Sequence, residues 1–412
     1  MINKINQAVI LCGGKGERLR PLTESTPKPM IRIDDRPFLE FLLEKISSQG
    51  IKRFVILSGY LGDQISDYFG SGAEWGIDIQ YSHGPTEWDT AKRLWESRSL
   101  LDNEFLFLYS DNYIDLNLLK LENHHFKFKK PLTLSLAKKK NGNIAIDEKS
   151  LVKKYDLYRS NTSLDLVEIG FMIINTSKVI SYYDNGNSSF SKIIERMTED
   201  NKVSGFEYHS AYYSISDPSR LEITKEYLLK DKILILDRDG TLNIRAPKAQ
   251  YIRSWNDFNW LPEAIDALKI LSNEGFKFIV ISNQAGIARK MVSDYEVESI
   301  NNRMRDELMK ESIEILETYY CPHHWDDGCY CRKPNPGLFF KASSDHLFRI
   351  EKSLYIGDDS RDCQAAYNAG CNSIFVGDNN ELKNLNSKEL PISDHSNLLE
   401  AVPDIINFYK TI

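Results

Sequence analysis

The chain has 412 residues, of which 42% are hydrophobic and 27% charged, so it can bury large cores and is expected to form two or three domains. Its net charge of -7 and isoelectric point near 5.7 exclude the basic surface that binding to nucleic acid or to an anionic membrane requires. No apolar run reaches the roughly 20 residues of a membrane span, no cleavage-site pattern follows the first residues, and six cysteines are too few for a disulfide scaffold, so we expect a cytoplasmic protein.

Short β-rich apolar runs alternate with amphipathic helical stretches along the whole chain. In the first half we expect strands at 8–12, 53–59, 105–111 and 167–175 and a helix at 36–50; in the second half we expect strands at 232–236, 276–283, 353–359 and 372–377 and a helix at 261–275. This alternation predicts an α/β protein with two doubly wound, three-layer domains, whose ligands lie at the carboxyl ends of parallel strands.

No flexible linker separates the halves, because the stretch 220–231 has a helical pattern and leads directly into the strand 232–236. We therefore expect domains at 1–230 and 231–412, with the boundary near Asp231. The sequence does not define an oligomeric state.

A glycine-rich loop, "LCGGKGERLRPLTESTPKPM", follows the first expected strand. Backbone N–H groups of such a loop can approach a polyphosphate closely, and Arg18 and Lys28 could add fixed positive charge. The string resembles the signature of sugar-1-phosphate nucleotidylyltransferases, and the resemblance covers about residues 7–228. It implies a Rossmann-like domain in which a sugar 1-phosphate attacks the α-phosphorus of a nucleoside triphosphate and pyrophosphate leaves.

The resemblance also implies roles for single residues. Gly13, Gly14, Gly16 and Arg18 would hold the nucleotide phosphates, Lys28 would lie near the reacting phosphate, Asp111 would bind Mg²⁺, and Gly170 would line the substrate site. The chain departs from the family pattern at Asp89 and Lys92 (usually glycines), at Leu157 (usually a lysine), and at Ser214 (usually a metal-binding aspartate). A hydroxyl binds Mg²⁺ poorly compared with a carboxylate. Loss of catalysis in this domain, which would then bind or regulate, is therefore the alternative.

The second half begins with "LDRDGTLN", in which Asp237 and Asp239 follow a buried strand. Two carboxylates in this position can act as nucleophile and acid/base, with Mg²⁺ neutralising charge. Ser282 in "VISNQAG", Lys333 in "CRKPNPG" and the aspartates of "IGDDSRD" follow in order. Together these motifs resemble the haloacid dehalogenase superfamily of phosphatases.

In that superfamily Asp237 would attack phosphorus, and Asp239 would protonate the leaving oxygen and then activate water. Ser282 and Lys333 would hold the phosphoryl oxygens, and Asp358 and the carboxylate of Asp237 would bind Mg²⁺. Asp239 is also counted among the metal candidates.

Three further residues complete the expected phosphatase site. We expect Asp362 to orient Lys333 or its loop rather than to bind metal. Asn283 and Arg332 are expected to contact the substrate.

A cluster of three cysteines and one histidine lies in "CPHHWDDGCYCRKPNPG". Its spacing, C-x-H-x5-C-x-C, predicts a closed, tetrahedral and structural Zn²⁺ site formed by Cys321, His323, Cys329 and Cys331. His324 is the alternative to His323 as ligand. The metal would fix the adjacent basic pair of Arg332 and Lys333.

This loop and "SNQAGIARK" resemble the branch that contains the D-glycero-D-manno-heptose 1,7-bisphosphate 7-phosphatases and the histidinol-phosphate phosphatases. The resemblance covers roughly residues 232–378, although "RAPKAQYIRSWNDF" differs from the usual heptose-enzyme segment. A 7-phosphatase would produce the heptose 1-phosphate that a nucleotidylyltransferase consumes. We therefore expect a bifunctional enzyme that makes a nucleotide-activated heptose for a surface polysaccharide, with sugar phosphates and nucleoside triphosphates as its small-molecule partners. A phosphatase for histidinol phosphate or another small monoester is the remaining alternative.

Overall fold

The computed structural model describes residues 5–184, 189–229, 232–247 and 250–411. The chain divides into two compact units, Met1–Lys225 and Glu226–Ile412. The expected boundary at Asp231 lies outside the described residues. Among the described residues, no helix combines the length and apolar character that crossing a bilayer needs.

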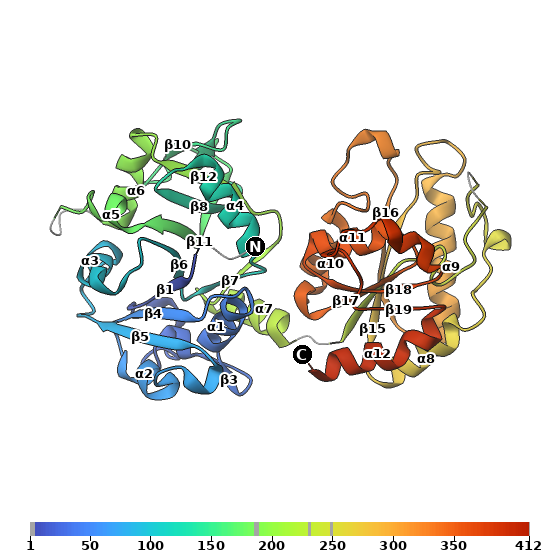
Figure 1. The fold of residues 1–412 in the computed structure, drawn as a ribbon, viewed down its shortest axis with the longest axis horizontal. Coiled ribbons are helices and arrows are strands. Elements are labelled where there is room, and N and C mark those ends of the chain that lie inside the picture. The colour runs from blue at the N-terminus through green and yellow to red at the C-terminus, as the bar shows by residue number, and fades with distance from the viewer. Residues whose placement is uncertain (1–4, 185–188, 230–231, 248–249, 412) are drawn as a thin grey trace. The chain divides into compact units, whose positions relative to one another are not determined.

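The first unit is an α/β domain built on one large sheet (Figure 1). Its strands are β1 (Gln7–Cys12), β2 (Arg32–Ile33), β3 (Arg36–Pro37), β4 (Arg53–Ser58), β5 (Asp78–His83), β6 (Glu104–Tyr109), β7 (Asn112–Ile114), β8 (Leu132–Lys138), β9 (Ile144–Ile146), β10 (Val152–Tyr155), β11 (Leu166–Asn175), β12 (Val203–Glu207) and β13 (Tyr212–Ser214). Its helices are α1 (Phe38–Ser48), α2 (Asp63–Phe69), α3 (Thr90–Glu96), α4 (Leu118–Phe128), α5 (Thr176–Ile180), α6 (Phe190–Glu199) and α7 (Pro218–Leu229).

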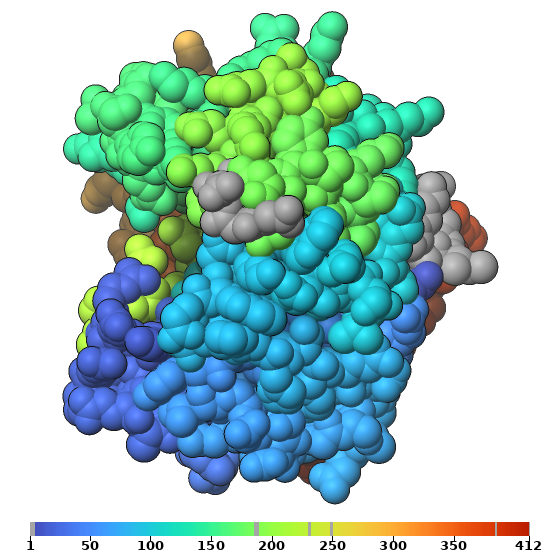
Figure 2. All heavy atoms as spheres, turned by 90° about the vertical axis from the view of Figure 1, so that its left-hand side faces the viewer, coloured from blue at the N-terminus to red at the C-terminus, as the bar shows by residue number. Residues whose placement is uncertain are grey.

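The large sheet of this unit is mixed rather than purely parallel. β1 lies at its centre, parallel to both β4 and β6, whereas β11 runs antiparallel to β6 and to β8. Figure 2 shows one face of the unit, on which residues of α3 lie beside those of α5 and α6. β1 is buried along almost its whole length, which explains its continuous apolar sequence.

The second unit contains a six-stranded parallel sheet in the order β16-β15-β14-β17-β18-β19. Its strands are β14 (Ile233–Leu236), β15 (Lys277–Asn283), β16 (Ile315–Cys321), β17 (Leu354–Gly357), β18 (Asn372–Val376) and β19 (Ser393–His395). Its helices are α8 (Ala264–Asn273), α9 (Asp294–Lys310), α10 (Gly337–His346), α11 (Ser360–Ala369) and α12 (Leu398–Thr411).

Helices cover both faces of this second sheet, so the unit has three layers (Figure 1). Leu234 and Leu236 of β14 pack into the core with α8, α9 and α12, whereas Ile233 and Ile235 pack into the opposite core with α10 and α11. The alternation follows from the two-residue period of a strand. The predicted α/β class is confirmed, and the carboxyl ends of β14, β15 and β17 converge at one edge.

Candidate active sites

The site of the second unit forms where β14 and its two neighbouring strands end. Asp237 directly follows β14, and its N–H donates to the carbonyl of Ile356 in β17 at 2.8 Å. Asp358 directly follows β17. Parallel pairing of these strands therefore brings together two carboxylates that lie far apart in the sequence.

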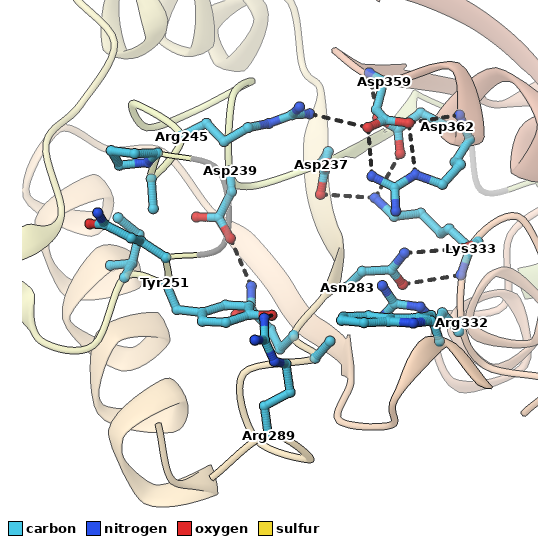
Figure 3. Close-up of a pocket in the computed structure, with 18 residues that line it drawn as sticks. Asp237, Asp239, Arg245, Tyr251, Asn283, Arg289, Arg332, Lys333, Asp359 and Asp362 are labelled. Atoms are coloured by element: carbon cyan, nitrogen blue, oxygen red, sulfur yellow. Dashed lines mark hydrogen bonds and ion pairs between the residues drawn. The ribbon is translucent and has the colours of Figure 1, made fainter. Parts of the chain in front are cut away.

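Lys333 is the central cation of the site (Figure 3). Its side chain is 3% exposed, and its Nζ lies 2.9 Å from Asp237 Oδ1 and 2.8 Å from Asp362 Oδ1. The same atom donates to the hydroxyl of Tyr355 at 2.6 Å and to the carbonyl of Ile281 at 3.1 Å. Burial alone would lower the pKa of Lys333, but the attraction of Asp237 and Asp362 outweighs burial and raises that pKa.

Three carboxylates beside Lys333 can hold a cation. Asp237, Asp358 and Asp362 each offer an oxygen, and these atoms lie within 4.8 Å of one another. The Oδ1 atom of Asp358 is buried, and the structure gives it no hydrogen-bond partner among the described residues. Burial and mutual repulsion raise the pKa of Asp237 to about 6 and that of Asp358 to about 8. A divalent cation would relieve both effects, so the donor set fits Mg²⁺.

The side chain of Asp239 lies outside this carboxylate group, which contains Asp362 in its place. Arg238 donates to both oxygens of Asp239, at 3.2 and 2.9 Å, and Gln284 and Asn243 donate at 2.8 and 3.0 Å. Burial alone would raise the pKa of Asp239, but Arg238 and the other donors lower it. Asp239 is therefore held as a carboxylate beside Asp237.

Asn283 and Ser282 end β15 at the same edge. The amide of Asn283 donates to the carbonyl of Lys333 and accepts from its N–H, both at 3.1 Å. Asn283, which was expected to contact the substrate, lines the cavity of this site, and its amide also holds the loop that carries Lys333. Ser282 is buried and its hydroxyl accepts from Gln284 at 3.1 Å.

The cysteine cluster lies on the loop that carries Lys333. The three sulfur atoms of Cys321, Cys329 and Cys331 are 3.4 to 3.5 Å apart, and Nδ1 of His323 lies 3.2 Å from Cys331 Sγ. None of the three cysteines forms a disulfide. Their sulfur–sulfur distances approach the about 3.8 Å expected for sulfurs bound to one Zn²⁺ at about 2.3 Å. Nδ1 of His324 instead lies 3.2 Å from Asp326 Oδ2. Of the two histidines, the structure therefore places His323 at the cluster.

A cavity of about 480 Å³ opens over Asp237, Asp239 and Lys333 (Figure 3). Four arginines line it: Arg245, Arg289, Arg332 and Arg361. Arg332, which was expected to contact the substrate, reaches the carbonyl of His323 at 3.4 Å.

Sequence reasoning did not assign the other three arginines. Nη2 of Arg245 lies 2.7 Å from Asp358 Oδ2, and Arg361 donates to Asp359 at 2.8 and 2.6 Å. The divergent segment "RAPKAQYIRSWNDF" contains Arg245, so that departure was the available signal.

In the first unit the glycine loop lines a cavity of about 620 Å³ together with Arg18, Lys28 and Asp111. Nζ of Lys28 lies 2.6 Å from Asp111 Oδ2, which joins the loop to the end of β6. Gly16 has a φ of 64°, in the left-handed region that favours glycine.

Gly13 and Gly14 follow β1, and Gly14 and Gly16 line the cavity. A Cβ atom on Gly13 would lie 2.4 Å from the buried guanidinium of Arg93. Arg93 donates to the carbonyls of Ser58 and Pro85, at 2.5 and 2.6 Å, and so holds the strand ends behind the glycine loop. The sequence did not single out this arginine.

Three of the residues that depart from the transferase pattern have local partners in the fold. Asp89 caps α3 by accepting from the N–H of Lys92 at 2.8 Å, and the Lys92 side chain pairs with Glu96. Ser214 lies opposite Asn112 in the β13–β7 pair, and its hydroxyl accepts from the N–H of Ser216 at 3.1 Å.

Gly170 lies in β11 and packs against the turn that contains Asp111. It has a φ of 82°, and a Cβ there would come within 2.9 Å of Asn112 Nδ2. Leu157 is half-buried and does not line the two cavities of this unit that contain Asp111.

Comparison with known proteins agrees with this division. Residues 7–153 match the nucleotidyl transferase family, and residues 232–397 match the polynucleotide kinase 3 phosphatase family. The chain is thus a nucleotidyl transferase-like unit followed by a phosphatase unit of the haloacid dehalogenase type, as the motifs predicted.

The curated relatives narrow the phosphatase class. The D-glycero-alpha-D-manno-heptose-1,7-bisphosphate 7-phosphatase of Photorhabdus laumondii is 33% identical over 154 residues, which are 36% of this chain and 82% of the relative. The probable D-glycero-D-manno-heptose-1,7-bisphosphate 7-phosphatase of Thermoplasma volcanium is 37% identical over 127 residues, which are 31% of this chain and 85% of the relative. Through its second unit, the chain belongs to this family of heptose-bisphosphate 7-phosphatases.

Solved structures resemble both units. HddC from Yersinia pseudotuberculosis is 21% identical, with a TM-score of 0.47, over 54% of this chain and 100% of that chain. The D,D-heptose 1.7-bisphosphate phosphatase from B. bronchiseptica is 27% identical, with a TM-score of 0.40, over 43% of this chain and 98% of that chain.

Proposed function

We propose that the chain performs two successive steps in the cytoplasm. The second unit removes the 7-phosphate of a heptose 1,7-bisphosphate, and the first unit transfers a nucleotidyl group from a nucleoside triphosphate to the resulting heptose 1-phosphate. The observation that carries the proposal is the position of Lys333, whose Nζ pairs with both Asp237 and Asp362 beside Asp358. This arrangement occurs in a chain that belongs to a family of heptose-bisphosphate phosphatases.

For the phosphatase step we assign Asp237 as the nucleophile. Its carboxylate oxygen forms a bond to phosphorus while the bond to the sugar oxygen breaks. Asp239, which is a carboxylate in the free site, must first take up a proton from solvent in order to pass it to this oxygen. Water then attacks the aspartyl phosphate, and Asp239, held as a carboxylate by Arg238, takes a proton from it. Lys333 and Ser282 orient the phosphoryl oxygens.

We assign Mg²⁺ to the group of Asp237 and Asp358, with Asp362 as the neighbouring carboxylate. When bound, the ion neutralises charge on the phosphate and on the nucleophile. We assign a structural Zn²⁺ to Cys321, His323, Cys329 and Cys331, where it fixes the loop that presents Lys333.

For the transferase step, the glycine loop and Arg18 hold the triphosphate, and Lys28 contacts the reacting phosphate beside Asp111. An oxygen of the sugar phosphate bonds to the α-phosphorus as the bond to pyrophosphate breaks. Asp111 would hold Mg²⁺, which screens the triphosphate charge. Positioning and charge neutralisation supply the catalysis.

A second candidate is a first unit that only binds or regulates, and the neutral Ser214 favours it. The test supplies the purified chain with heptose 1,7-bisphosphate and each common nucleoside triphosphate at millimolar Mg²⁺. Release of both phosphate and pyrophosphate supports the bifunctional proposal. Phosphate without pyrophosphate supports the second candidate, and preference for histidinol phosphate in a monoester panel overturns the heptose assignment.

A further inference from the structure

A second cavity of the first unit, of about 450 Å³, adjoins the glycine-loop cavity. The two share Arg18, Tyr109, Asp111 and Ser216 as lining residues, so they meet at Asp111. The second cavity thus begins where the reacting phosphate would lie.

Three cations that belong to no recognised motif line this second cavity. They are Lys139, just after β8, Arg159, in the loop between β10 and β11, and Arg220 in α7. Only the fold brings these segments together.

The three cations have few ion-pair partners, although the carboxylate of Glu168 in the same cavity attracts Arg159. Among the described residues, no carboxylate lies within ion-pair distance of Lys139 or Arg159, and Arg220 has only Asp217 at 3.6 Å. Asp217 also caps α7, since it accepts from the Arg220 N–H at 3.0 Å and from the Ser219 hydroxyl at 2.7 Å. Partial burial, and then the nearby Arg220 and Arg159, lower the pKa of Lys139, as expected for like charges held close together.

One departure from the transferase pattern concerns this same cavity. Ser214, which lines the cavity, stands where the family pattern has a metal-binding carboxylate, whereas Leu157, at the place of the pattern's lysine, does not line it. A neutral residue at 214 removes the charge that would hold a second metal ion. Positive charge for an acceptor phosphate must then come from side chains.

We propose that Lys139, Arg159 and Arg220 bind the phosphate of the sugar 1-phosphate acceptor, in place of a second metal ion. This inference rests on the proposed transferase function, but it concerns binding and can be tested without turnover. The polar residues Glu168 and Tyr212 line the same cavity and can meet sugar hydroxyls.

The test titrates the full-length protein with mannose 1-phosphate in EDTA by calorimetry. The variants are Lys139→Met, Arg159→Met and Arg220→Met, and Lys140→Met, an exposed neighbour that does not line the cavity, is the matched control. We expect each cavity variant to weaken binding by about tenfold or more, the usual effect of losing a charged hydrogen bond. Binding by Lys140→Met should stay within about twofold, and the KM for nucleoside triphosphate should stay unchanged in all variants that turn over.

The outcomes separate this inference from the proposed function. If wild type binds mannose 1-phosphate and the cavity variants do not, the inference stands even where no pyrophosphate is released. Wild-type binding only when Mg²⁺ is present, no wild-type binding, or equal binding by all variants overturns it. Lys139→Arg should bind mannose 1-phosphate almost as tightly as wild type, in contrast to Lys139→Met, because it keeps the positive charge. If Lys139 served only to pack its aliphatic stem, charge would not be needed for binding.

Discussion

Gly240 offers the sharpest test of the phosphatase geometry, because its backbone passes directly over a proposed metal ligand. It has a φ of 100°, and a Cβ atom there would lie 1.9 Å from Asp358 Oδ2 and 2.4 Å from Asp358 Cγ. In Gly240→Ala the Asp358 carboxylate would have to retreat by more than 1 Å to reach a contact of 3.0 Å. A displacement of this size at reacting groups costs about 100-fold in rate.

Alanine at this φ also strains the backbone by about 1–2 kcal/mol, so loss of stability must be separated from loss of the site. Gly370 provides the control, since it has a φ of 84° at the end of α11 and a methyl group there would meet no atom within 4 Å among the described residues. Gly370→Ala should lose the same about 1–2 kcal/mol of unfolding free energy while keeping its phosphatase rate.

The assay measures phosphate release from heptose 1,7-bisphosphate over a range of Mg²⁺ concentrations, together with denaturant unfolding of each variant. We expect Gly240→Ala to lose about 100-fold in kcat/KM and to require more Mg²⁺. Activity of Gly240→Ala within about threefold of wild type, or an equal loss in Gly370→Ala, would refute the assignment of Asp358 to the site.

Four further changes test the remaining assignments. Asp237→Asn should lower phosphate release to below about one per cent while nucleotide binding to the first unit is unchanged; a higher residual rate removes Asp237 as the nucleophile. Cys329→Ser should lower the zinc content from one ion per chain and reduce phosphatase activity through the Lys333 loop, and absence of zinc from wild type purified without chelator contradicts the site. Ser214→Asp should lower the Mg²⁺ concentration for half-maximal pyrophosphate release, whereas an unchanged midpoint shows that this position does not reach the metal. Burial and neighbouring carboxylates raise the pKa of Asp358 to about 8 and that of Asp237 to about 6 in the cation-free form, so Mg²⁺ binding must displace protons; affinity should rise from pH 6 to 8, and calorimetry in two buffers should detect proton release.

The phosphatase motifs could be located from the sequence because most of them lie at the carboxyl end of a strand, at the same edge of a parallel sheet. Asp237, Ser282 and Asp358 all obey this rule, and the structure gathers them at that edge. Lys333 was placed only by its motif, since it lies on a long loop. Its contacts with Tyr355 and Asp362 depend on how that loop packs, which no local pattern encodes.

Two of the residues that sequence reasoning missed, Arg93 and Arg245, come from segments that depart from the family patterns. Arg93 belongs to the stretch that replaces the usual glycines, and only the fold shows that it ties the strand ends behind the glycine loop. The strand 167–175 was predicted, but a continuous apolar run does not reveal whether its neighbours are parallel or antiparallel. The mixed character of the first sheet therefore appeared only in the structure.

The charges around the phosphatase cavity bear on which substrate it admits. Arg361 is bound to Asp359 through two hydrogen bonds, and Lys333 lies between two aspartates. Arg289 and Arg332, in contrast, hydrogen-bond to neutral groups: the hydroxyl of Tyr251 at 3.1 Å and the carbonyl of His323 at 3.4 Å.

Two guanidiniums at the cavity wall that form no ion pair with a carboxylate of the described residues attract a second anionic group on the substrate and repel an ammonium. A heptose bisphosphate carries such a second phosphate, whereas histidinol phosphate carries a protonated amine. These two arginines therefore offer the second phosphate of a bisphosphate a partner that they do not offer to an amine. This argument for a bisphosphate substrate is independent of the family comparison, because it rests on which arginines the fold leaves without a carboxylate partner.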